Sequence, residues 1–411
     1  MTIRILHTAD CHLDSPLQSL ALRDPELRDR VQTATRTAFA RIIDTALAGQ
    51  VQALLIAGDL FDGAERSART AAFLTAQLDR LHAAGIAVFY IKGNHDAENP
   101  ITGALSLPEN VHIFDGRGGK VQLGDTDVWI HGVSFAGRHA PDSLLGKFPA
   151  PVAGAVNIAM LHTSLVGAAG HDPYAPCTVA ELAGMGFDYW ALGHVHKRQV
   201  HGQAPWIVMP GTPQGRDMGE AGAKTASLLT LVDGAITVSE MPTSAISFLH
   251  HDIDVSAHDH ADGLRAHLRE ALAALAEAQP SDAILRLTLK GATPLHWQLL
   301  RDRDVWQETL AQMAQDTGVL WLEKLRIEVT DDHAPSDASA TDALGQMMRD
   351  MLAEPGMMAA LQEEFDALLA ELPASRRTEL APTPEAAAAR AQQLAASGAA
   401  QMIARMKGAD G

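Results

Sequence analysis

The 411-residue sequence predicts an α/β protein whose first part is a parallel sheet with crossover helices. Short apolar segments alternate with helical patterns over the first hundred residues, and this β-α-β order requires parallel strands. Residues with metal-ligand side chains follow directly after several of these segments, as at the loop edge of an α/β sheet. A composition of 47% hydrophobic and 20% charged residues allows a sizeable core and more than one domain.

Apolar segments predict three strands in the first hundred residues, at Ile3–Thr8, Ala53–Ala57 and Ile86–Ile91. Between the first two strands, apolar residues recur on one helical face, at Val31, Ala34, Ala38 and Ile42. A second helix is predicted around Ala71–Ala83. The loops at the carboxyl ends of such strands are where functional groups gather.

After Asn110 the predicted strands become shorter and more closely spaced. They are Val111–Phe114, Val128–Val133, Val156–Leu161, Tyr189–Leu192, Trp206–Met209, Ser227–Leu231 and Ile236–Ser239. So many predicted strands favour a structure in which two sheets pack against each other and helices cover the outer faces. The first domain is therefore predicted to cover residues 1–242.

Residues 247–330 predict a compact β-α-β-α-β domain. Its strands are expected at Leu249–Val255, Ile284–Leu289 and Leu320–Val329, and its helices at Gly263–Ala278 and Leu295–Asp316. Residues 331–341 are polar and predict a linker. The sequence of residues 342–411 predicts a helical tail whose helices are interrupted near Pro355, Pro373 and Pro382.

Within the tail, an apolar stripe follows a 3-4-3-4 spacing, at Met358, Leu361, Phe365, Leu368 and Leu372. Such a stripe suits a partner helix, and it equally suits packing within its own domain. The sequence leaves both interpretations open.

The composition excludes several classes of protein. With only Cys11 and Cys177, no disulfide framework is expected, so the reducing cytoplasm is the predicted location. No apolar run approaches the roughly 18 to 20 residues of a membrane helix. The first twelve residues resemble a strand that leads into polar chemistry and not a signal peptide. No contact with a membrane is therefore expected.

The net charge of -18 is unusual for a protein that binds nucleic acid by itself. Residues 251–411 contain 26 acidic and 14 basic side chains, so most of the excess lies in the last two fifths of the chain. This charge disfavours tight DNA binding by the chain alone. It remains compatible with a nuclease that gains affinity from a partner.

Five short polar clusters each follow a predicted strand. They are Asp10-Cys11-His12, Gly58-Asp59-Leu60-Phe61-Asp62, Gly93-Asn94-His95-Asp96, His162, and Gly193-His194-Val195-His196. Residues i and i+2 of an extended segment point the same way, so Asp10 with His12 can direct two donors into one cleft. One cluster alone would carry little weight in a chain with 19 histidines. Five in succession at strand ends indicate a shared site.

The donor types indicate which ions this site would bind. Carboxylate, amide oxygen and imidazole suit borderline divalent ions such as Mn²⁺, Fe²⁺ or Zn²⁺. Apart from Cys11, thiolates are missing from the clusters, which disfavours a structural zinc site. The glycines before Asp59, Asn94 and His194 allow sharp turns and close approach of the backbone to a ligand.

This series resembles the signature of the calcineurin-like metallophosphoesterases, which runs Asp-x-His, Gly-Asp-x-x-Asp, Gly-Asn-His-(Asp/Glu), His, Gly-His-x-His. The resemblance covers residues 1 to about 240, and every signature position is filled. It implies a four-layer α/β/β/α sandwich with a dinuclear site at the sheet edge, here with a small α/β capping domain and a helical C-terminal tail.

The resemblance also implies a role for each residue. One ion would be bound by Asp10, His12, Asp59 and His196, and the other by Asp59, Asn94, His162 and His194. Asp59 would bridge two divalent ions, expected to be Mn²⁺. His95 would stay free of metal as proton donor or transition-state stabiliser, oriented by Asp62 or Asp96. Phosphodiester bonds would be hydrolysed by a hydroxide that the two metals activate.

Two stretches resemble the SbcD-like and YhaO-like DNA repair exonucleases: residues 5–14, and residues 210–216 with Gly219-Glu220. This resemblance implies DNA as substrate, exonuclease or endonuclease activity in DNA repair, and a partner that is an SbcC-like coiled-coil ATPase. The capping domain would contact DNA, the tail would bind the partner, and the chain could form a homodimer. Residues near the metal loops are candidates for substrate contact: Arg66, Arg69, Lys197, Arg198, Gln214 and Arg216.

Two alternatives remain. A phosphodiesterase or phosphatase acting on a small nucleotide would need a tight pocket for one base or sugar. A non-catalytic scaffold would be expected to lack some ligands, and none is missing from the sequence.

Overall fold

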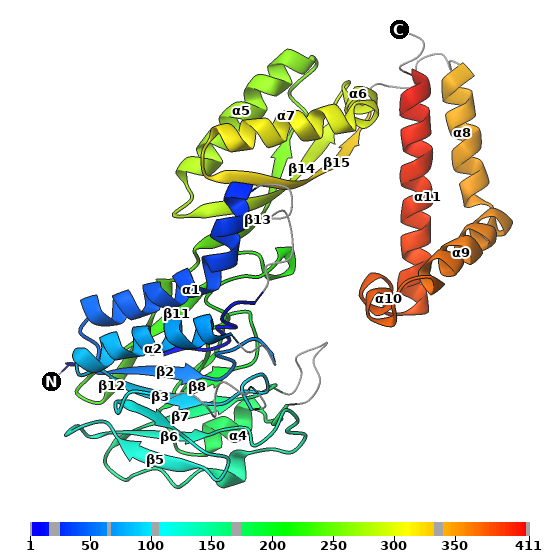
Figure 1. The fold of residues 1–411 in the computed structure, drawn as a ribbon. Helices are drawn as coiled ribbons and strands as arrows, with labels where there is room; N and C mark the ends of the chain where they lie inside the picture. Colours follow the sequence, from blue (N-terminus) through cyan, green and yellow to red (C-terminus); the bar gives the residue numbers. More distant parts are fainter. Residues whose placement is uncertain are drawn as a thin grey trace. The chain divides into compact units, whose positions relative to one another are not determined.

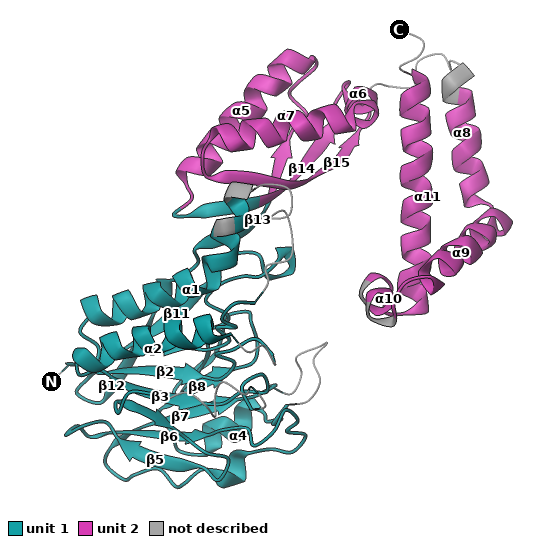
Figure 2. Ribbon diagram, in the orientation of Figure 1, with its two compact units in different colours: residues 1–250, 280–284 teal, residues 251–279, 285–411 magenta. Residues whose placement is uncertain are grey.

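The computed structural model describes residues 2–15, 25–63, 67–97, 99, 107–165, 174–332 and 340–407. The chain divides into two compact units, Met1–His250 with Pro280–Ile284, and His251–Gln279 with Leu285–Gly411 (Figure 2). Among the described residues, no helix is both long enough and apolar enough to cross a membrane.

The first unit contains two six-stranded sheets. The first has the order β12-β11-β1-β2-β3-β4. Its strands are β1 (Thr2–Thr8), β2 (Ala53–Ala57), β3 (Ala87–Ile91), β4 (Val111–Ile113), β11 (Thr225–Val232) and β12 (Ala235–Pro242). Strands β1 to β4 are parallel, as the β-α-β pattern predicts, whereas β11 and β12 are antiparallel additions.

The second sheet has the order β5-β6-β7-β8-β10-β9. Its strands are β5 (Gly119–Gln122), β6 (Val128–Val133), β7 (Val156–His162), β8 (Tyr189–Gly193), β9 (Gln199–Gln203) and β10 (Trp206–Met209). The four inner strands are parallel, and the edge strands β5 and β9 pair antiparallel.

Side chains from both faces of each sheet build the layers. On β2, Ala53, Leu55 and Ala57 belong to a core shared with the second sheet, whereas Leu54 and Ile56 belong to a core on the opposite face. This opposite core includes residues of α1 (Pro25–Ala48) and α2 (Ala68–Ala83), which cover that face in Figure 1. Alternate side chains of a strand point to opposite faces, so a strand buried on both faces is apolar throughout.

A third core covers the outer face of the second sheet. It includes Trp190 and Leu192 of β8 and Leu182 of α4 (Val179–Gly184). The described part of this unit also contains the short 3₁₀ helices η2 (Leu145–Lys147) and η3 (Met218–Glu220). Three cores separate four layers, so the α/β/β/α sandwich is confirmed.

Two strands of the sandwich differ from the sequence prediction. Strands β5 and β9 were not predicted, and both lie at an edge with mostly exposed or half-buried side chains. An edge strand without a buried face has no apolar run to reveal it.

The three-stranded sheet β13-β14-β15 belongs mostly to the second unit, and the first residues of β13 and β14 are assigned to the first unit. Its strands are β13 (Ile246–Asp254), β14 (Asp282–Ala292) and β15 (Leu320–Thr330), and its helices are α5 (Ala261–Glu277), α6 (His296–Arg301) and α7 (Arg303–Asp316). In Figure 1, α5 and α7 lie over one face of this sheet. One helix was predicted where α6 and α7 form, and the helix is interrupted at Asp302, whose φ of -98° and ψ of 27° are not helical.

The tail is helical, as predicted, and consists of α8 (Ala340–Ala353), α9 (Pro355–Ala370), α10 (Ala374–Leu380) and α11 (Pro384–Lys407). Pro355 and Pro384 are the first residues of α9 and α11, and Pro373 directly precedes α10. A proline at the first helical position loses no hydrogen bond. Most of the predicted linker, residues 333–339, lies outside the described residues.

The apolar stripe of the tail was interpreted either as a contact for a partner helix or as packing within its own domain, and each interpretation fits part of the stripe. Met358, Leu361 and Phe365 are half-buried, and α9 contacts α8 and α11. Leu368 is 64% exposed and Leu372 is also exposed. The first part of the stripe therefore packs within the tail, and the end of the stripe remains open.

Candidate metal centre

The candidate ligands come from the carboxyl ends of five strands. Asp10 and His12 follow β1, Asp59 follows β2, Asn94 follows β3, His162 ends β7, and His194 and His196 follow β8. Strands β1, β2 and β3 are neighbours in one sheet, and β7 and β8 are neighbours in the other. The loops at these ends of both sheets therefore supply one cluster of side chains.

The backbone around the cluster is strained. Asp10, His12, Asp59 and His194 have φ values of 52°, 40°, 52° and 99°, in the region that favours glycine. The loop after β1 is bound to the loop after β2, since the N–H of Asp10 donates to Gly58 O and the N–H of His12 donates to Asp59 O, both at 3.0 Å. Strain of this kind persists where surrounding contacts fix the backbone, and it is common at functional sites.

Asp10, His12 and His196 form the first ligand group, with one donor atom from each lying within 4.8 Å of the others. The Nε2 atoms of His12 and His196 are 3.1 Å apart. Two imidazole lone pairs this close repel each other unless a cation or proton lies between them. Burial lowers the pKa of His12, which favours the neutral ring that binds metals.

Asp10, Asp59 and His162 form the second group. His162 Nε2 lies 3.4 Å from Asp59 Oδ2 and 3.1 Å from Asn94 Oδ1. The other ring nitrogen, Nδ1, donates to Ala57 O at 2.9 Å, so the Nε2 lone pair is directed at the cluster. Burial alone lowers the pKa of His162, but the Asp59 carboxylate outweighs burial and raises this pKa to about 9. The cluster thus favours a positive charge, which bound divalent ions would supply.

The ring of His194 lies beside His162, with 5.2 Å between ring centroids. Its backbone N–H donates to both carboxylate oxygens of Asp10 at 3.0 Å. His194 therefore lies beside the second group, on the side of the second sheet, without a ring nitrogen in that group. Six of the seven expected ligands bring nitrogen or oxygen donors together, and this donor set fits divalent ions: Asp10, His12, Asp59, Asn94, His162 and His196.

The glycines that precede three ligands are required by these side chains. A Cβ atom on Gly93 would lie 2.2 Å from Asp59 Oδ1, and one on Gly58 would lie 2.3 Å from His162 Nδ1. A Cβ atom on Gly193 would lie 2.1 Å from Ala57 O. The sequence predicts that these glycines let the backbone come close to a bound ligand. In the structure they also leave space for the side chains of Asp59 and His162 and for the backbone of Ala57.

His95 lies at the edge of the cluster, with its ring centroid 4.8 Å from that of His12. Its Nδ1 accepts a hydrogen bond from the N–H of Gly63 at 3.0 Å, so in the neutral ring the proton is on Nε2. Asp62 Oδ1 lies 3.7 Å from the same Nδ1 and 3.5 Å from His12 Nδ1. This geometry makes His95 Nε2 a hydrogen-bond donor.

Asp96 has a different environment from Asp62. It is fully buried and accepts hydrogen bonds from the N–H groups of Leu60, Phe61 and Gly93 at 3.0 to 3.2 Å. Burial, with a smaller contribution from Asp59, raises its pKa to about 6. Asp96 therefore holds the loop after β2 against the loop after β3, and Asp62 is the carboxylate that faces the His95 ring.

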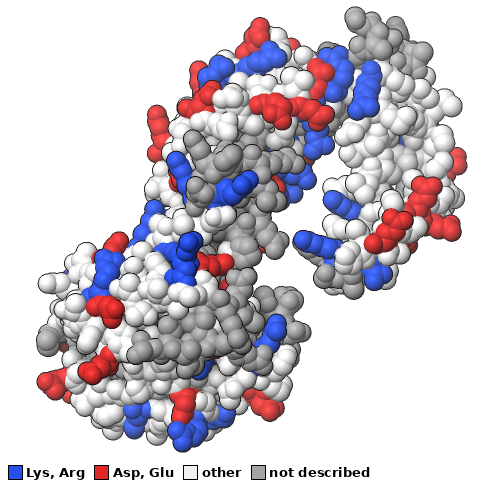
Figure 3. Space-filling model, in the orientation of Figure 1, with Lys and Arg blue, Asp and Glu red and all other residues white. Residues whose placement is uncertain are grey.

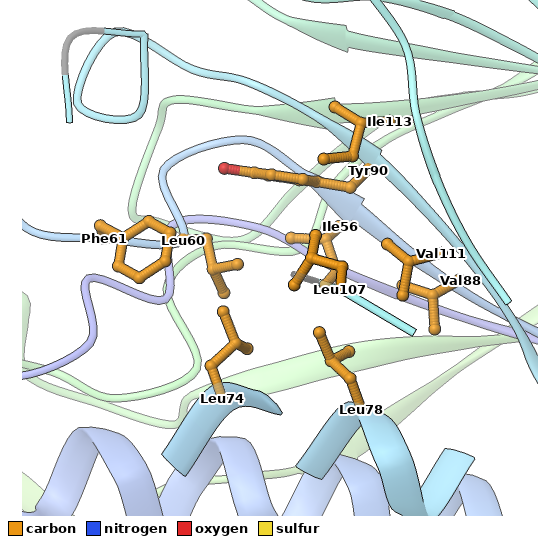
Figure 4. Close-up of a pocket in the computed structure, with 10 residues that line it drawn as sticks. All are labelled: Ile56, Leu60, Phe61, Leu74, Leu78, Val88, Tyr90, Leu107, Val111 and Ile113. Atoms are coloured by element: carbon orange, nitrogen blue, oxygen red, sulfur yellow. The ribbon is translucent and has the colours of Figure 1, made fainter. Parts of the chain in front are cut away.

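Leu60 and Phe61 also line the cavity drawn in Figure 4. Its walls are apolar side chains of β2, β3, β4, α2 and Leu107, with the Tyr90 hydroxyl as a polar group. None of the candidate ligands lines this cavity, so it belongs to the core behind the metal loops.

The expected substrate contacts fall into three groups. Arg66 lies outside the described residues. Lys197 and Arg69 are exposed, and Arg216 is half-buried beside His196. Arg198 donates to Ser227 Oγ at 2.7 Å and pairs with Glu240 at 3.0 Å, so its guanidinium joins strand residues of the sandwich.

Gln214 is fully buried, and its amide makes four hydrogen bonds to backbone groups of Gly215, Ala245 and Ile246. Its function in the structure is to bind the 210–216 loop to β13. A contact with substrate would break these bonds, so we do not propose one for Gln214.

Glu220 is a residue whose role the sequence did not reveal. Its Oε1 accepts from His196 Nδ1 at 2.7 Å, and the same carboxylate pairs with Arg216 at 2.7 Å. A proton held on Nδ1 leaves Nε2 free to bind a metal. The signal in the sequence was that Glu220 follows shortly after residues 210–216. The spacing of residues along the chain did not indicate that its partner is His196.

We expect Glu220→Ala to weaken metal binding about 10- to 100-fold, the usual effect of losing such a partner. The measurement is Mn²⁺ affinity by calorimetry on the folded protein. Glu240→Ala, at an exposed carboxylate, is the control and should bind Mn²⁺ normally. Unchanged affinity in Glu220→Ala would contradict the role assigned to this carboxylate.

A four-layer sandwich with this donor set defines a calcineurin-like phosphoesterase, and the family model of that name matches residues 3–198. A second family model, for the middle domain of the metallophosphoesterase YhaO, matches residues 248–330. The uncharacterized metallophosphoesterase YhaO of Bacillus subtilis is 32% identical over 349 residues, which cover 83% of this chain and 84% of that protein. The chain belongs to the YhaO family of calcineurin-like metallophosphoesterases, and it is a hydrolase of phosphodiester bonds.

More distant relatives are named as proteins of DNA repair and as nucleases. The DNA double-strand break repair protein Mre11 of Methanopyrus kandleri is 26% identical over 235 residues, 52% of this chain and 49% of that protein. A polypeptide of the nuclease SbcCD of Escherichia coli is 24% identical over 280 residues, 57% of this chain and 66% of that polypeptide. The chain thus spans about half to two thirds of these two relatives.

Proposed function

We propose that this protein is a metal-dependent DNA nuclease of DNA repair, acting in the cytoplasm as an exonuclease or endonuclease. The single observation that carries the chemistry is that two donor groups, Asp10 with His12 and His196, and Asp10 with Asp59 and His162, lie beside an imidazole that donates from Nε2. DNA as substrate is supported by similarity to relatives whose names include DNA repair and nuclease. Mn²⁺ is the proposed ion because the donor set lacks thiolate and is rich in oxygen and imidazole.

When bound, two divalent ions lower the pKa of a water molecule and offset negative charge on the phosphate. Asp10, His12 and His196 would hold one ion, and Asn94, His162 and His194 the other, with Asp59 shared. His95 Nε2–H would donate to the leaving oxygen as negative charge develops there. Asp62 would help to position the His95 ring, because its Oδ1 lies 3.7 Å from His95 Nδ1.

The test is degradation of end-labelled duplex DNA in Mn²⁺, with and without an SbcC-like ATPase from the same cell. We expect metal-dependent shortening or nicking that EDTA abolishes. Cyclic nucleotides and bis-p-nitrophenyl phosphate are compared in parallel. Hydrolysis of a cyclic nucleotide with intact DNA would favour the small-nucleotide alternative, and no hydrolysis of any ester would favour the scaffold.

We further propose that the capping domain, residues 247–330, contacts DNA and that the tail, residues 342–411, binds the ATPase. Exposed acidic side chains gather on the tail around α9, including Glu363, Glu364 and Asp366 (Figure 3). This charge repels phosphates and disfavours DNA as the partner of the tail. The exposed apolar end of the stripe, Leu368 and Leu372, suits a protein helix.

We expect the double variant Leu368→Asp/Leu372→Asp to lose co-purification with the ATPase, because two charges would enter an apolar contact. Both positions are exposed, so the helices themselves should remain folded. Val305→Asp, at an exposed apolar residue of α7, is the matched control. Full retention of the ATPase by the double variant would refute the assignment of the tail.

A further inference from the structure

Lys224 is a buried lysine just before β11. The residue as a whole is only 8% exposed, and within the described part of the chain its ammonium has no hydrogen bond or ion pair. Burial lowers the pKa of this ammonium. A cation that is partly removed from water and has no partner in the protein is stabilised by a nearby anion, so an anion at this position would be favourable.

The surroundings of Lys224 connect it to the metal centre. A Cβ atom on Gly215 would lie 3.2 Å from Lys224 Cε and 2.9 Å from Glu220 O, so the lysine stem packs against the 210–216 loop. Arg216 follows in that loop, and its Nη2 lies 2.8 Å from His196 Nδ1. Lys224 is therefore separated from a candidate metal ligand by Arg216 and Glu220.

The charged groups that act on Lys224 are Glu220, Asp217, Arg216 and Lys197. The Glu220 carboxylate already pairs with Arg216 and accepts from His196. Asp217 accepts from the N–H of Gly219 at 2.7 Å. With Lys224 included, these groups are three cations and two carboxylates that are already engaged. Asp62 and Asp10 also act on Arg216, but both lie in the candidate metal groups, so neither is a partner of Lys224.

The contacts of Arg216 explain how it can join such a site. Its Nη2 and the Glu220 carboxylate both approach His196 Nδ1, which can accept from the former or donate to the latter but cannot do both. If His196 Nε2 were to hold a metal, the ring proton would be on Nδ1 and Glu220 would accept it. An N–H of Arg216 is then available to another acceptor.

We infer that Lys224 and Arg216 form a binding site for a second phosphate group of the substrate, next to the metal centre. This inference rests on the proposed function in one respect, since a nucleic acid carries successive phosphates and a simple phosphate ester does not. A phosphate at the metals and its neighbour at Lys224 and Arg216 would fix the direction of the bound strand.

The test compares two inhibitors of bis-p-nitrophenyl phosphate hydrolysis, thymidine 3′,5′-bisphosphate and thymidine 5′-monophosphate. We expect the unaltered protein to bind the bisphosphate at least about tenfold more tightly, the effect of one charged hydrogen bond. Lys224→Gln should lose this preference, whereas Lys147→Gln, at an exposed lysine of η2, should keep it. Lys224 is the better position for the test because Arg216 also holds Glu220.

Three outcomes would overturn the inference: no bisphosphate preference in the unaltered protein, an unchanged preference in Lys224→Gln, or loss of all hydrolysis in Lys224→Gln. The last would mean that Lys224 maintains the metal centre instead of a separate phosphate site. A different result would contradict the proposed nuclease function alone. In that case end-labelled DNA would stay intact, while the unaltered protein would still prefer the bisphosphate.

Discussion

Asp59→Asn is expected to abolish hydrolysis of bis-p-nitrophenyl phosphate, with a fall of at least about a thousandfold. Asp59 Oδ2 lies 3.4 Å from His162 Nε2 and 3.9 Å from His12 Nε2, so this carboxylate lies between the two ligand groups. An amide keeps the shape of the side chain but offers one neutral oxygen in place of two anionic ones. Metal content by mass spectrometry should fall together with activity.

The control for Asp59→Asn is Asp142→Asn, the same change at an exposed residue, which should keep metal and activity. Circular dichroism establishes that each variant is folded. If Asp59→Asn retained two ions per chain and normal turnover, Asp59 would not be the bridging ligand. The assignment of both ligand groups would then be wrong.

His95→Asn is expected to lower turnover by about 10² to 10⁴-fold while leaving metal content and substrate binding unchanged. The reason is that Nδ1 of His95 accepts from Gly63, which leaves Nε2–H as the proton donor at the edge of the cluster. Asparagine has no group that can move a proton at neutral pH. The measurements are turnover number, KM and bound metal.

Asp62→Asn provides a second comparison, because Asp62 lies 3.7 Å from His95 and is also 3.5 Å from His12. Its turnover should fall less than that of His95→Asn, since the donor itself remains. His201→Asn, on the exposed edge strand β9, is the control. A near-normal turnover number in His95→Asn would eliminate His95 as the acid.

Individual strands and helices differ in how accurately the sequence predicted them. Strands β1, β2 and β3 appear within one residue of their predicted ends. β2 and β3 are apolar runs that are almost entirely buried, and β1 is mainly apolar and buried apart from Thr2 and Arg4. Strands β5 and β9 and the break between α6 and α7 escaped prediction. Their boundaries depend on edge position and on one residue's backbone angles, and neither leaves a periodic apolar pattern.

The sequence by itself determined which donors the site would contain and at which strand ends they stand. Chain order and residue type are sufficient for this, because parallel strands bring their carboxyl ends to one edge. Only the tertiary structure determined which side chains contact one another. It set Asp62 rather than Asp96 against His95, buried the amide of Gln214, and joined Glu220 to His196 across 24 residues. Such pairings depend on distances between segments that are remote in the chain, and no local periodicity records them.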